Sequence, residues 1–132
     1  MTAGVDASDL LELEKSNIRV VNAFIDSWRE PANVDFGFCA EDAVLRMSAD
    51  MPPSVGRVAA KDVWDRHMKP TDRVEVETHQ TLARGDVVTN VRTDVIHYED
   101  KPGLSVEIVG VFYVKGGQIK EWTDYIFSMK TI

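Results

Sequence analysis

Hydrophobic positions near the start of the chain recur at three- and four-residue steps. Pro31 follows this pattern and marks the end of a helix predicted over residues 8–28. A second helix is predicted over residues 58–68, ending before Lys69-Pro70. The predicted inward face of the first helix consists of Leu10, Leu13, Asn17, Val20, Val21, Phe24 and Trp28.

The second half of the chain changes to a pattern typical of β-strands. Residues 51–56, with two prolines and a glycine, are predicted as a loop that follows a short strand at 43–47. Helices first and an antiparallel meander last indicate an α+β fold, with the helices on one face of the sheet. A strongly curved sheet closed by the N-terminal helix would leave a deep pocket. Four β-rich runs, separated by glycine-containing hairpin segments, cover residues 74–83, 87–98, 105–114 and 118–128.

The turn between the first two runs of the meander determines which side chains face each other. If Asp94 points inward, a two-residue turn at residues 85–86 would place Glu77 opposite it. A three-residue loop at residues 84–86 with a glycine bulge would place Val76 there instead. The second arrangement keeps two carboxylates apart, so it is the one we predict.

Composition and charge narrow the class of protein. A length of 132 residues fits one domain, so residues 1–132 are predicted to form a single domain. The balance of 44% hydrophobic and 28% charged residues is typical of a soluble globular protein. The net charge of −7 and the lack of a Lys/Arg run argue against nucleic acid or an anionic membrane as a partner. No stretch approaches the roughly 18 apolar residues of a membrane helix.

Cysteine usage and the N-terminal residues bear on compartment. Cys39 is the only cysteine, so no internal disulfide forms, and no Cys/His spacing suggests a metal site. Residues 1–9 are polar and acidic, unlike a secretory signal. We therefore expect a cytoplasmic protein.

Candidate chemistry lies in the β-rich half of the chain. With a period of two, Asn90, Arg92, Asp94 and Ile96 share one face of a strand, and Arg92 lies about 7 Å from Asp94. Asp124 is set among aromatic and apolar residues and needs a partner if it is buried. The planar fork of Arg92 can serve two carboxylates at once. Such a bridge would keep one carboxyl protonated and the other ionised, as acid–base catalysis requires.

Spacing alone leaves a plainer interpretation open. An Arg-x-Asp pair on a strand is usually half of a solvated cross-strand ion pair. The apolar residues around it also fit an ordinary core, although in a cone-shaped fold the same inward positions line the cavity. His67, His79 and His97 have no metal-ligand spacing, and Cys39 is typical of a small buried residue.

Several segments, taken in order, resemble the limonene-1,2-epoxide hydrolase family. They are Val-Arg-Thr-Asp-Val at 91–95, Gly-Val-Phe at 110–112, Gly-Gln-Ile at 117–119 and Trp-Thr-Asp-Tyr at 122–125, with similar segments at 40–42 and 52–57. The resemblance runs loosely over residues 18–127. It implies the SnoaL-like, nuclear transport factor 2-like (cystatin-like) cone. In that cone a strongly curved mixed β-sheet packs against N-terminal helices and encloses a deep pocket.

The resemblance also implies an activity. An enzyme of this family adds water to a small apolar epoxide, terpene-like or cyclic, and releases a diol. Asp124 would deprotonate the water, Asp94 would protonate the epoxide oxygen and Arg92 would hold and polarise both, in one step without a covalent intermediate. No metal or organic cofactor is implied, and a homodimer through the outer sheet face is expected. The predicted substrate-binding residues are Asn90, Ile96, Val106, Ile108, Trp122, Ile126, Met47 and Leu45.

The first predicted strand departs from the family. Relatives position the nucleophilic water with a tyrosine and an asparagine two residues apart; here those places hold Leu45 and Met47, or Arg46 and Ser48 in the other register. Ser48 or Asn90 is a candidate for part of that role. Two alternatives therefore stay open. One is a polyketide or terpenoid cyclase or isomerase that uses the same acid pair, and the other is a non-catalytic binder of apolar small molecules.

Overall fold

The computed structural model describes residues 7–132 as two helices, two short 3-10 turns and six strands. In chain order these are α1 (Ala7–Asp26), η1 (Pro31–Asn33), η2 (Phe36–Phe38), β1 (Cys39–Arg46), β2 (Ser54–Val55), α2 (Arg57–Met68), β3 (Thr71–Arg84), β4 (Val87–Tyr98), β5 (Leu104–Lys115) and β6 (Gln118–Thr131).

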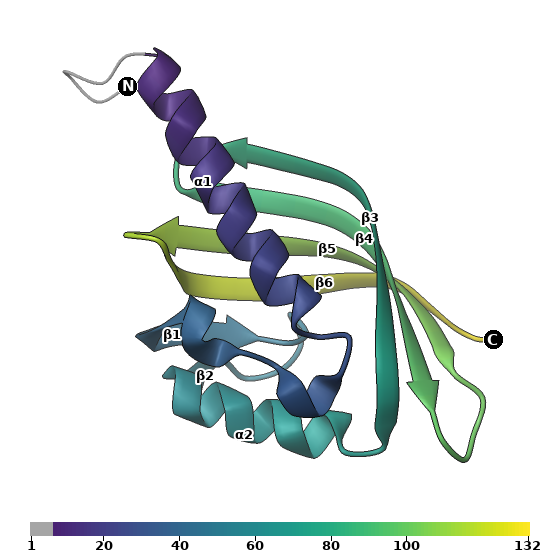
Figure 1. Ribbon diagram of the computed structural model, residues 1–132. Coiled ribbons are helices and arrows are strands. Elements are labelled where there is room, and N and C mark those ends of the chain that lie inside the picture. The colour runs from purple at the N-terminus through teal and green to yellow at the C-terminus, as the bar shows by residue number, and fades with distance from the viewer. Residues whose placement is uncertain (1–6) are drawn as a thin grey trace.

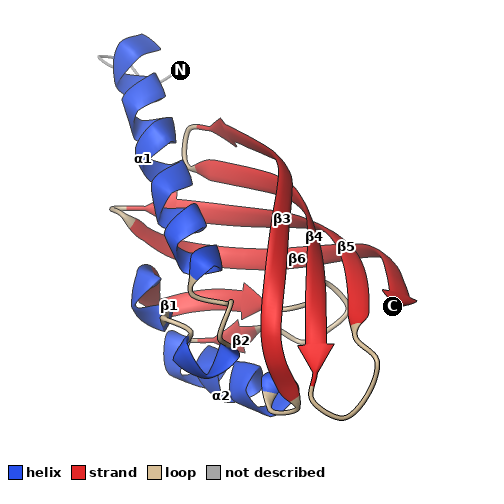
Figure 2. Ribbon diagram, turned by 45° about the vertical axis from the view of Figure 1, so that its right-hand side comes forward, coloured by secondary structure: helices blue, strands red, loops and turns tan. Residues whose placement is uncertain are grey.

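The six strands form one mixed sheet in the order β2-β1-β6-β5-β4-β3. Strands β3 to β6 are an antiparallel meander, and β1 pairs with β6 in parallel. Helix α1 runs across one face of the sheet, while α2 lies beside β1 and β2 (Figure 1). Figure 2 shows the long strands curving around the helical side. The predicted α+β cone is confirmed.

Element boundaries differ from the predictions in a few places. β1 begins at Cys39, four residues before the predicted strand, and the short strand β2 lies inside the predicted loop. α1 ends at Asp26, so Trp28 follows it in a turn. The backbone N–H of Trp28 donates to the Ile25 carbonyl at 2.9 Å. Leu13, predicted to face inward, is 41% exposed. The first turns of α1 extend past the edge of the sheet (Figure 1).

The β3–β4 hairpin reaches the predicted pairing by a different route. Arg84 pairs with Val87, so the turn has two residues, and the predicted three-residue loop is wrong. Gly85 takes φ +57° in this turn, a conformation that glycine adopts without steric cost. The register then shifts at His79, where β3 carries one extra residue. Beyond this bulge Val76 pairs with Asp94, as predicted.

Polar side chains of α1 fix the helix to the same hairpin. Glu14 Oε2 accepts from the Gly85 N–H at 3.0 Å, and Asn17 Nδ2 donates to the Gly85 carbonyl at 3.1 Å. Asn17 is buried, so this bond satisfies an amide that would otherwise lose its water contacts. The helix is thereby held across the inner side of β4.

The hydrophobic core lies between α1 and the sheet. Phe24 of α1 packs edge-on against Trp122 at 5.7 Å between ring centroids, and Trp122 stacks on Phe112 at 6.0 Å. These rings belong to the core cluster, and Trp122 lies two residues before Asp124 on β6. Within residues 7–132, no helix has the length and apolar character needed to span a bilayer.

Candidate active site

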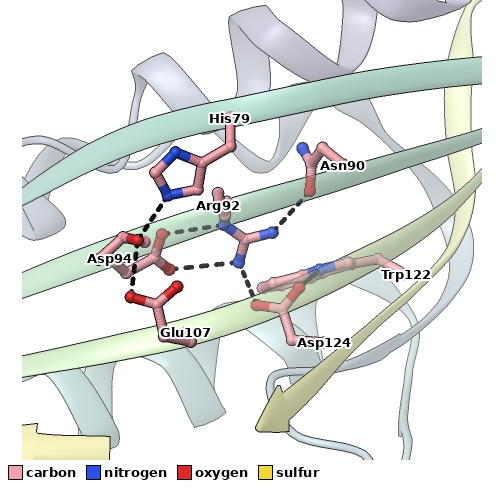
Figure 3. Close-up of polar contacts among 8 residues, drawn as sticks. His79, Asn90, Arg92, Asp94, Glu107, Trp122 and Asp124 are labelled. Atoms are coloured by element: carbon pink, nitrogen blue, oxygen red, sulfur yellow. Dashed lines mark hydrogen bonds and ion pairs between the residues drawn. The ribbon is translucent and has the colours of Figure 1, made fainter. Parts of the chain in front are cut away.

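Strand β4 directs three polar side chains into the interior. Alternate positions of β4 are buried, and among them Asn90, Arg92 and Asp94 lie on the inner face. Arg92 Nε donates to Asp94 Oδ1 at 2.9 Å, and Nη2 donates to Asp94 Oδ2 at 3.2 Å. Nη2 also donates to Asp124 Oδ2 on β6, and Nη1 donates to Asn90 Oδ1 at 3.0 Å. One guanidinium therefore joins two carboxyl groups and an amide (Figure 3).

Gly110 makes this bridge sterically feasible. It lies on β5, between β4 and β6, and pairs with Asn90 on one side and Asp124 on the other. A Cβ at this position would lie 2.5 Å from Arg92 Nη1 and 2.9 Å from Asp124 Oδ1. The missing side chain leaves the space in which Arg92 reaches across β5. The sequence carried a signal for this, since an isolated glycine inside a strand often marks a close approach of other groups.

An aromatic ring covers the guanidinium. The Arg92 Cζ lies 4.8 Å from the centroid of the Trp28 ring, a cation–π distance. Trp28 is buried and also lines the cavity described below. The helical pattern placed Trp28 on the inner face of the first helix but gave no sign that it would meet Arg92, because that contact joins distant parts of the chain.

Burial and charge act in opposite directions on the two carboxyl groups. Burial raises the pKa of Asp124 to about 6, with Arg92 opposing the rise, Asp94 adding to it and the Trp122 N–H opposing it. Burial also raises the pKa of Asp94, again against Arg92. Although burial acts to lower the pKa of the Arg92 guanidinium, Asp124 and Asp94 together raise it above its ordinary value. The arrangement therefore favours a permanently charged arginine between two acids that hold protons more readily than usual.

A cavity of about 240 Å³ lies beside the two carboxyl groups. Its wall is predominantly apolar, and both Asp94 and Asp124 border it. A substrate in this space would meet the acid pair from a largely dry side, where electrostatic interactions are stronger than in water. Six of the eight predicted substrate-binding residues line it, namely Met47, Ile96, Val106, Ile108, Trp122 and Ile126.

Leu45 and Asn90, the other two residues predicted to bind the substrate, do not line this cavity. Leu45 is 2% exposed and belongs to the core, where β1 pairs it with Trp122. Asn90 is fully buried one step further along β4, and its amide oxygen accepts from Arg92. Both side chains point inward as their strand positions require, but they lie beneath the wall of the cavity.

Several lining residues were not foreseen. Three methionines, Met51, Met68 and Met129, join Met47 in the wall, and flexible thioether side chains adapt to differently shaped apolar ligands. They come from a loop, from α2 and from β6, so no local pattern connects them. The remaining lining residues are Trp64, Val74 and Leu104 with the polar side chains of Ser48, His67, Thr71 and Tyr98.

The two candidates for holding a water have other partners. Ser48 lines the cavity, but its hydroxyl donates to Asp50 Oδ1. Asn90 is engaged with Arg92 beneath the wall. Met47, which one of the two predicted registers places at a water-positioning position, lines the cavity with its thioether side chain.

Of the histidine and cysteine side chains considered from the sequence, His67 lines the cavity. Cys39 and His79 lie away from the acid pair. Cys39 is fully buried, and burial raises the pKa of its thiol to about 12, so it holds its proton. His79 faces the outer side of the sheet, where its Nε2 lies 2.7 Å from Thr93 Oγ1. Across residues 7–132, the His, Cys, Asp and Glu side chains form no group of three or more that could hold a metal ion.

The comparison with protein families settles the relationship of this chain. The model of the limonene-1,2-epoxide hydrolase (LEH) catalytic domain matches residues 15–132. The chain belongs to this family. Arg92, Asp94 and Asp124 all fall within the matched region, as does the whole cavity wall.

Solved structures similar to this LEH-family chain support the fold. An M. tuberculosis LEH-like epoxide hydrolase is 24% identical with a TM-score of 0.74, covering 86% of this chain and 84% of that one. SalBIII, an epoxide hydrolase/cyclase-like enzyme of pyran ring formation in the polyether salinomycin, is 13% identical with a TM-score of 0.77, covering 90% and 98%. A Shewanella putrefaciens CN-32 protein assigned as a SnoaL-like polyketide cyclase is 11% identical with a TM-score of 0.74, covering 96% and 92%. No curated protein matches the chain.

Proposed function

We propose that this protein hydrolyses a small apolar epoxide, terpene-like or cyclic, to a diol. The observation that carries the proposal is the pair of buried carboxyl groups, Asp94 and Asp124, joined by Arg92 at the wall of an apolar cavity. Membership of the LEH family supports the same conclusion.

The proposed reaction is a single acid–base step. Asp124 takes a proton from water while the water oxygen bonds to an epoxide carbon. The carbon–oxygen bond of the ring breaks, and its oxygen takes the proton held by Asp94. Arg92 keeps both carboxyl groups in place and offsets the charge of whichever is ionised. After the step, Asp124 releases its proton to solvent and Asp94 takes up a proton from solvent, which restores the starting state.

The apolar wall affects the protonation of both carboxyl groups. Asp94 and Asp124 are 7% and 4% exposed, and burial raises the pKa of both, so each holds a proton more readily than a solvated carboxyl group does. An epoxide bound against the wall would meet one protonated and one ionised carboxyl group. No metal or organic cofactor takes part in the proposed step.

A diol-release assay on a panel of cyclic and terpene-like epoxides tests the proposal. The unsubstituted protein should form diol, and Asp124→Asn should reduce kcat by at least about 100-fold. Asp42→Asn is the matched control, because Asp42 lies on the surface and pairs with Lys120. A single turnover in H₂¹⁸O should place the label in the diol and none in the protein. Label in a protein carboxyl group would exclude direct attack by water.

A second candidate is an epoxide-opening cyclase, in which a hydroxyl of the substrate replaces water. The observation in its favour is that the cavity wall offers few side chains that could position a water molecule. Met47 and Ile126 contribute no hydrogen-bonding group there, and the Ser48 hydroxyl is used by Asp50. A nucleophile tethered to the substrate needs no side chain to position it. The likeness to SalBIII supports this candidate.

Hydroxy-epoxides separate the two candidates. A substrate with a hydroxyl three or four carbons from the epoxide gives a cyclic ether by cyclisation and a triol by hydrolysis. Mainly ether, lost in Asp124→Asn, would support the cyclase; mainly triol would support the hydrolase. A folded protein that binds such compounds without converting any would instead be a binder of apolar molecules.

We also propose that two copies pair through the outer face of the sheet. This face carries Val87, Tyr113 and Tyr125, which are 41%, 36% and 47% exposed. Sedimentation at micromolar concentration should give a dimer, and Tyr125→Lys should give a monomer. A monomeric unsubstituted protein would exclude this assembly.

A further inference from the structure

We propose that Trp122 is a positioning residue that orients the carboxyl group of Asp124 through its indole N–H. The inference rests on the proposed function for its kinetic consequence and on the structure for its geometry. Trp122 was predicted only as an apolar contact for the substrate, a role that needs its ring and makes no use of its nitrogen.

The two oxygens of Asp124 have different donors. Trp122 Nε1 donates to Oδ1 at 2.7 Å, and Arg92 Nη2 donates to Oδ2. A carboxylate held at one oxygen can rotate about its terminal torsion, which is broad for aspartate. Two donors on separate oxygens fix the plane of the group. The direction in which Asp124 presents its remaining lone pairs to the cavity is then set by Arg92 and Trp122 together.

The indole ring itself is held by aromatic neighbours. Trp122 stacks on Phe112 with an interplanar angle of 3°, and Phe24 packs edge-on at 88°. Trp28 lies against it at 5.1 Å between centroids. The N–H is therefore preorganised and needs no rearrangement when Asp124 gains or loses a proton.

Loss of this donor has a defined electrostatic sign. The titratable groups that border the cavity are Asp94, Asp124, His67 and Tyr98, and the charged groups that act on Asp124 are Arg92 and Asp94. A hydrogen bond to a carboxylate favours its ionised form, so the Trp122 N–H holds the pKa of Asp124 below the value that burial alone would give. Trp122→Phe keeps an aromatic ring in the stack and removes the donor.

The test compares two tryptophan-to-phenylalanine variants by their pH profiles. Trp122→Phe should move the acidic limb of kcat/KM upward by about one pH unit, with about a tenfold loss below that limb. Trp64→Phe is the matched control. Trp64 also lines the cavity, and the variant also removes a buried N–H bond, but that N–H donates to the Pro31 carbonyl at 2.9 Å instead of to the acid pair. Its KM can change, while its acidic limb should stay in place.

A second measurement needs neither a substrate nor a substitution at Trp122. In the unsubstituted protein, the indole ¹H–¹⁵N signal of Trp122 should titrate together with the carboxyl ¹³C signal of Asp124, and both transitions should be absent in Asp124→Asn. The indole signal of Trp64 should not follow them. Because these signals report the hydrogen bond directly, they stand even if no epoxide is turned over.

The outcomes are distinct. A titrating Trp122 signal in a protein without epoxide activity would keep the positioning role and remove the proposed function. An active enzyme in which Trp122→Phe leaves both the acidic limb and the Asp124 carboxyl titration unchanged would overturn the positioning role. The same holds if the indole signal of Trp122 ignores the titration of Asp124.

Discussion

The two faces of the sheet each carry a connected row of polar side chains, and they differ in what covers them. On the outer face, His79 Nε2 lies 2.7 Å from Thr93 Oγ1, which donates to Glu107 Oε1 at 2.9 Å. On the inner face, Arg92 joins Asp94 and Asp124 (Figure 3). The outer row runs over β3, β4 and β5, whereas the inner row joins β4 to β6 across β5, so β4 contributes to each.

Burial separates the two rows. The His79 side chain is 41% exposed, whereas that of Arg92 is 0% exposed beneath α1 and the aromatic cluster. Water screens the outer row, so its bonds contribute little. The inner charges have lost their water and depend on one another. Similar hydrogen-bonding patterns on one sheet therefore contribute differently to stability, and in the inner row burial raises the pKa of both carboxyl groups.

The largest expected effect comes from removing the inner cation. Arg92→Met removes the cation shared by two buried carboxyl groups, so the free energy of unfolding should fall by about 3–5 kcal/mol. Urea titration followed by circular dichroism at pH 8 measures the change. The matched outer-face change, His79→Gln, should stay within about 1 kcal/mol. Equal effects from the two variants would remove the proposed difference between the faces.

The pH dependence of stability sharpens the same comparison. The pKa of Asp124 rises from 3.8 to about 6 on folding, so between these values the folded state binds more protons than the unfolded state. Stability from this group is therefore present below pH 4 and is lost as the pH rises through about 6. The loss is at most about 3 kcal/mol. Unfolding of Asp124→Asn between pH 4 and 8 should lack this component, whereas Glu107→Gln on the outer face should keep it.

Filling the gap across β5 should disrupt the inner row without touching the outer one. Gly110→Ala places a Cβ 2.5 Å from Arg92 Nη1, which forces the guanidinium to move. We expect a loss of about 1–3 kcal/mol in unfolding free energy and about 100-fold in kcat/KM. Val109→Ala, the neighbouring residue on the opposite face, is the control for kinetics. Wild-type activity in Gly110→Ala would show that the bridge is not needed.

The smallest effect is expected from breaking the outer row. Thr93→Val removes the hydroxyl between His79 and Glu107 and keeps a β-branched side chain suited to a strand. Unfolding free energy should change by less than about 1 kcal/mol, and kcat/KM by less than about twofold. Thr93 lies between Arg92 and Asp94 in sequence, so a large kinetic loss here would mean that the two faces are coupled.

Local patterns were sufficient for most of the architecture. The β-rich runs became β3 to β6 with shifts of at most three residues at their ends, because alternation and glycine turns are properties of neighbouring residues. The pairing of Val76 with Asp94 was also predicted, although through a loop that does not exist. A bulge at His79 produces the same register as a longer turn, and no feature of the sequence distinguishes the two.

Local sequence patterns also predicted part of the candidate site. Period-two spacing placed Arg92 and Asp94 on one face, and the apolar neighbours of Asp124 indicated that this side chain would need a partner if it were buried. Their meeting across β5 was a hypothesis until Gly110 was found between them. The cavity wall was harder to foresee, since Met51, Met68 and Met129 come from three separate elements.

The sequence by itself determined the order of helices and strands, the shared strand face of Arg92 and Asp94, and the family to which the chain is similar. Only the tertiary structure decided that Trp28 covers Arg92, that Trp122 bonds to Asp124, and that Leu45 and Asn90 lie beneath the cavity wall. Periodicity fixes the face on which a side chain lies, because it follows from local backbone geometry. Depth below the surface and the partner across the sheet depend on the packing of residues far apart in the chain, which no local pattern records.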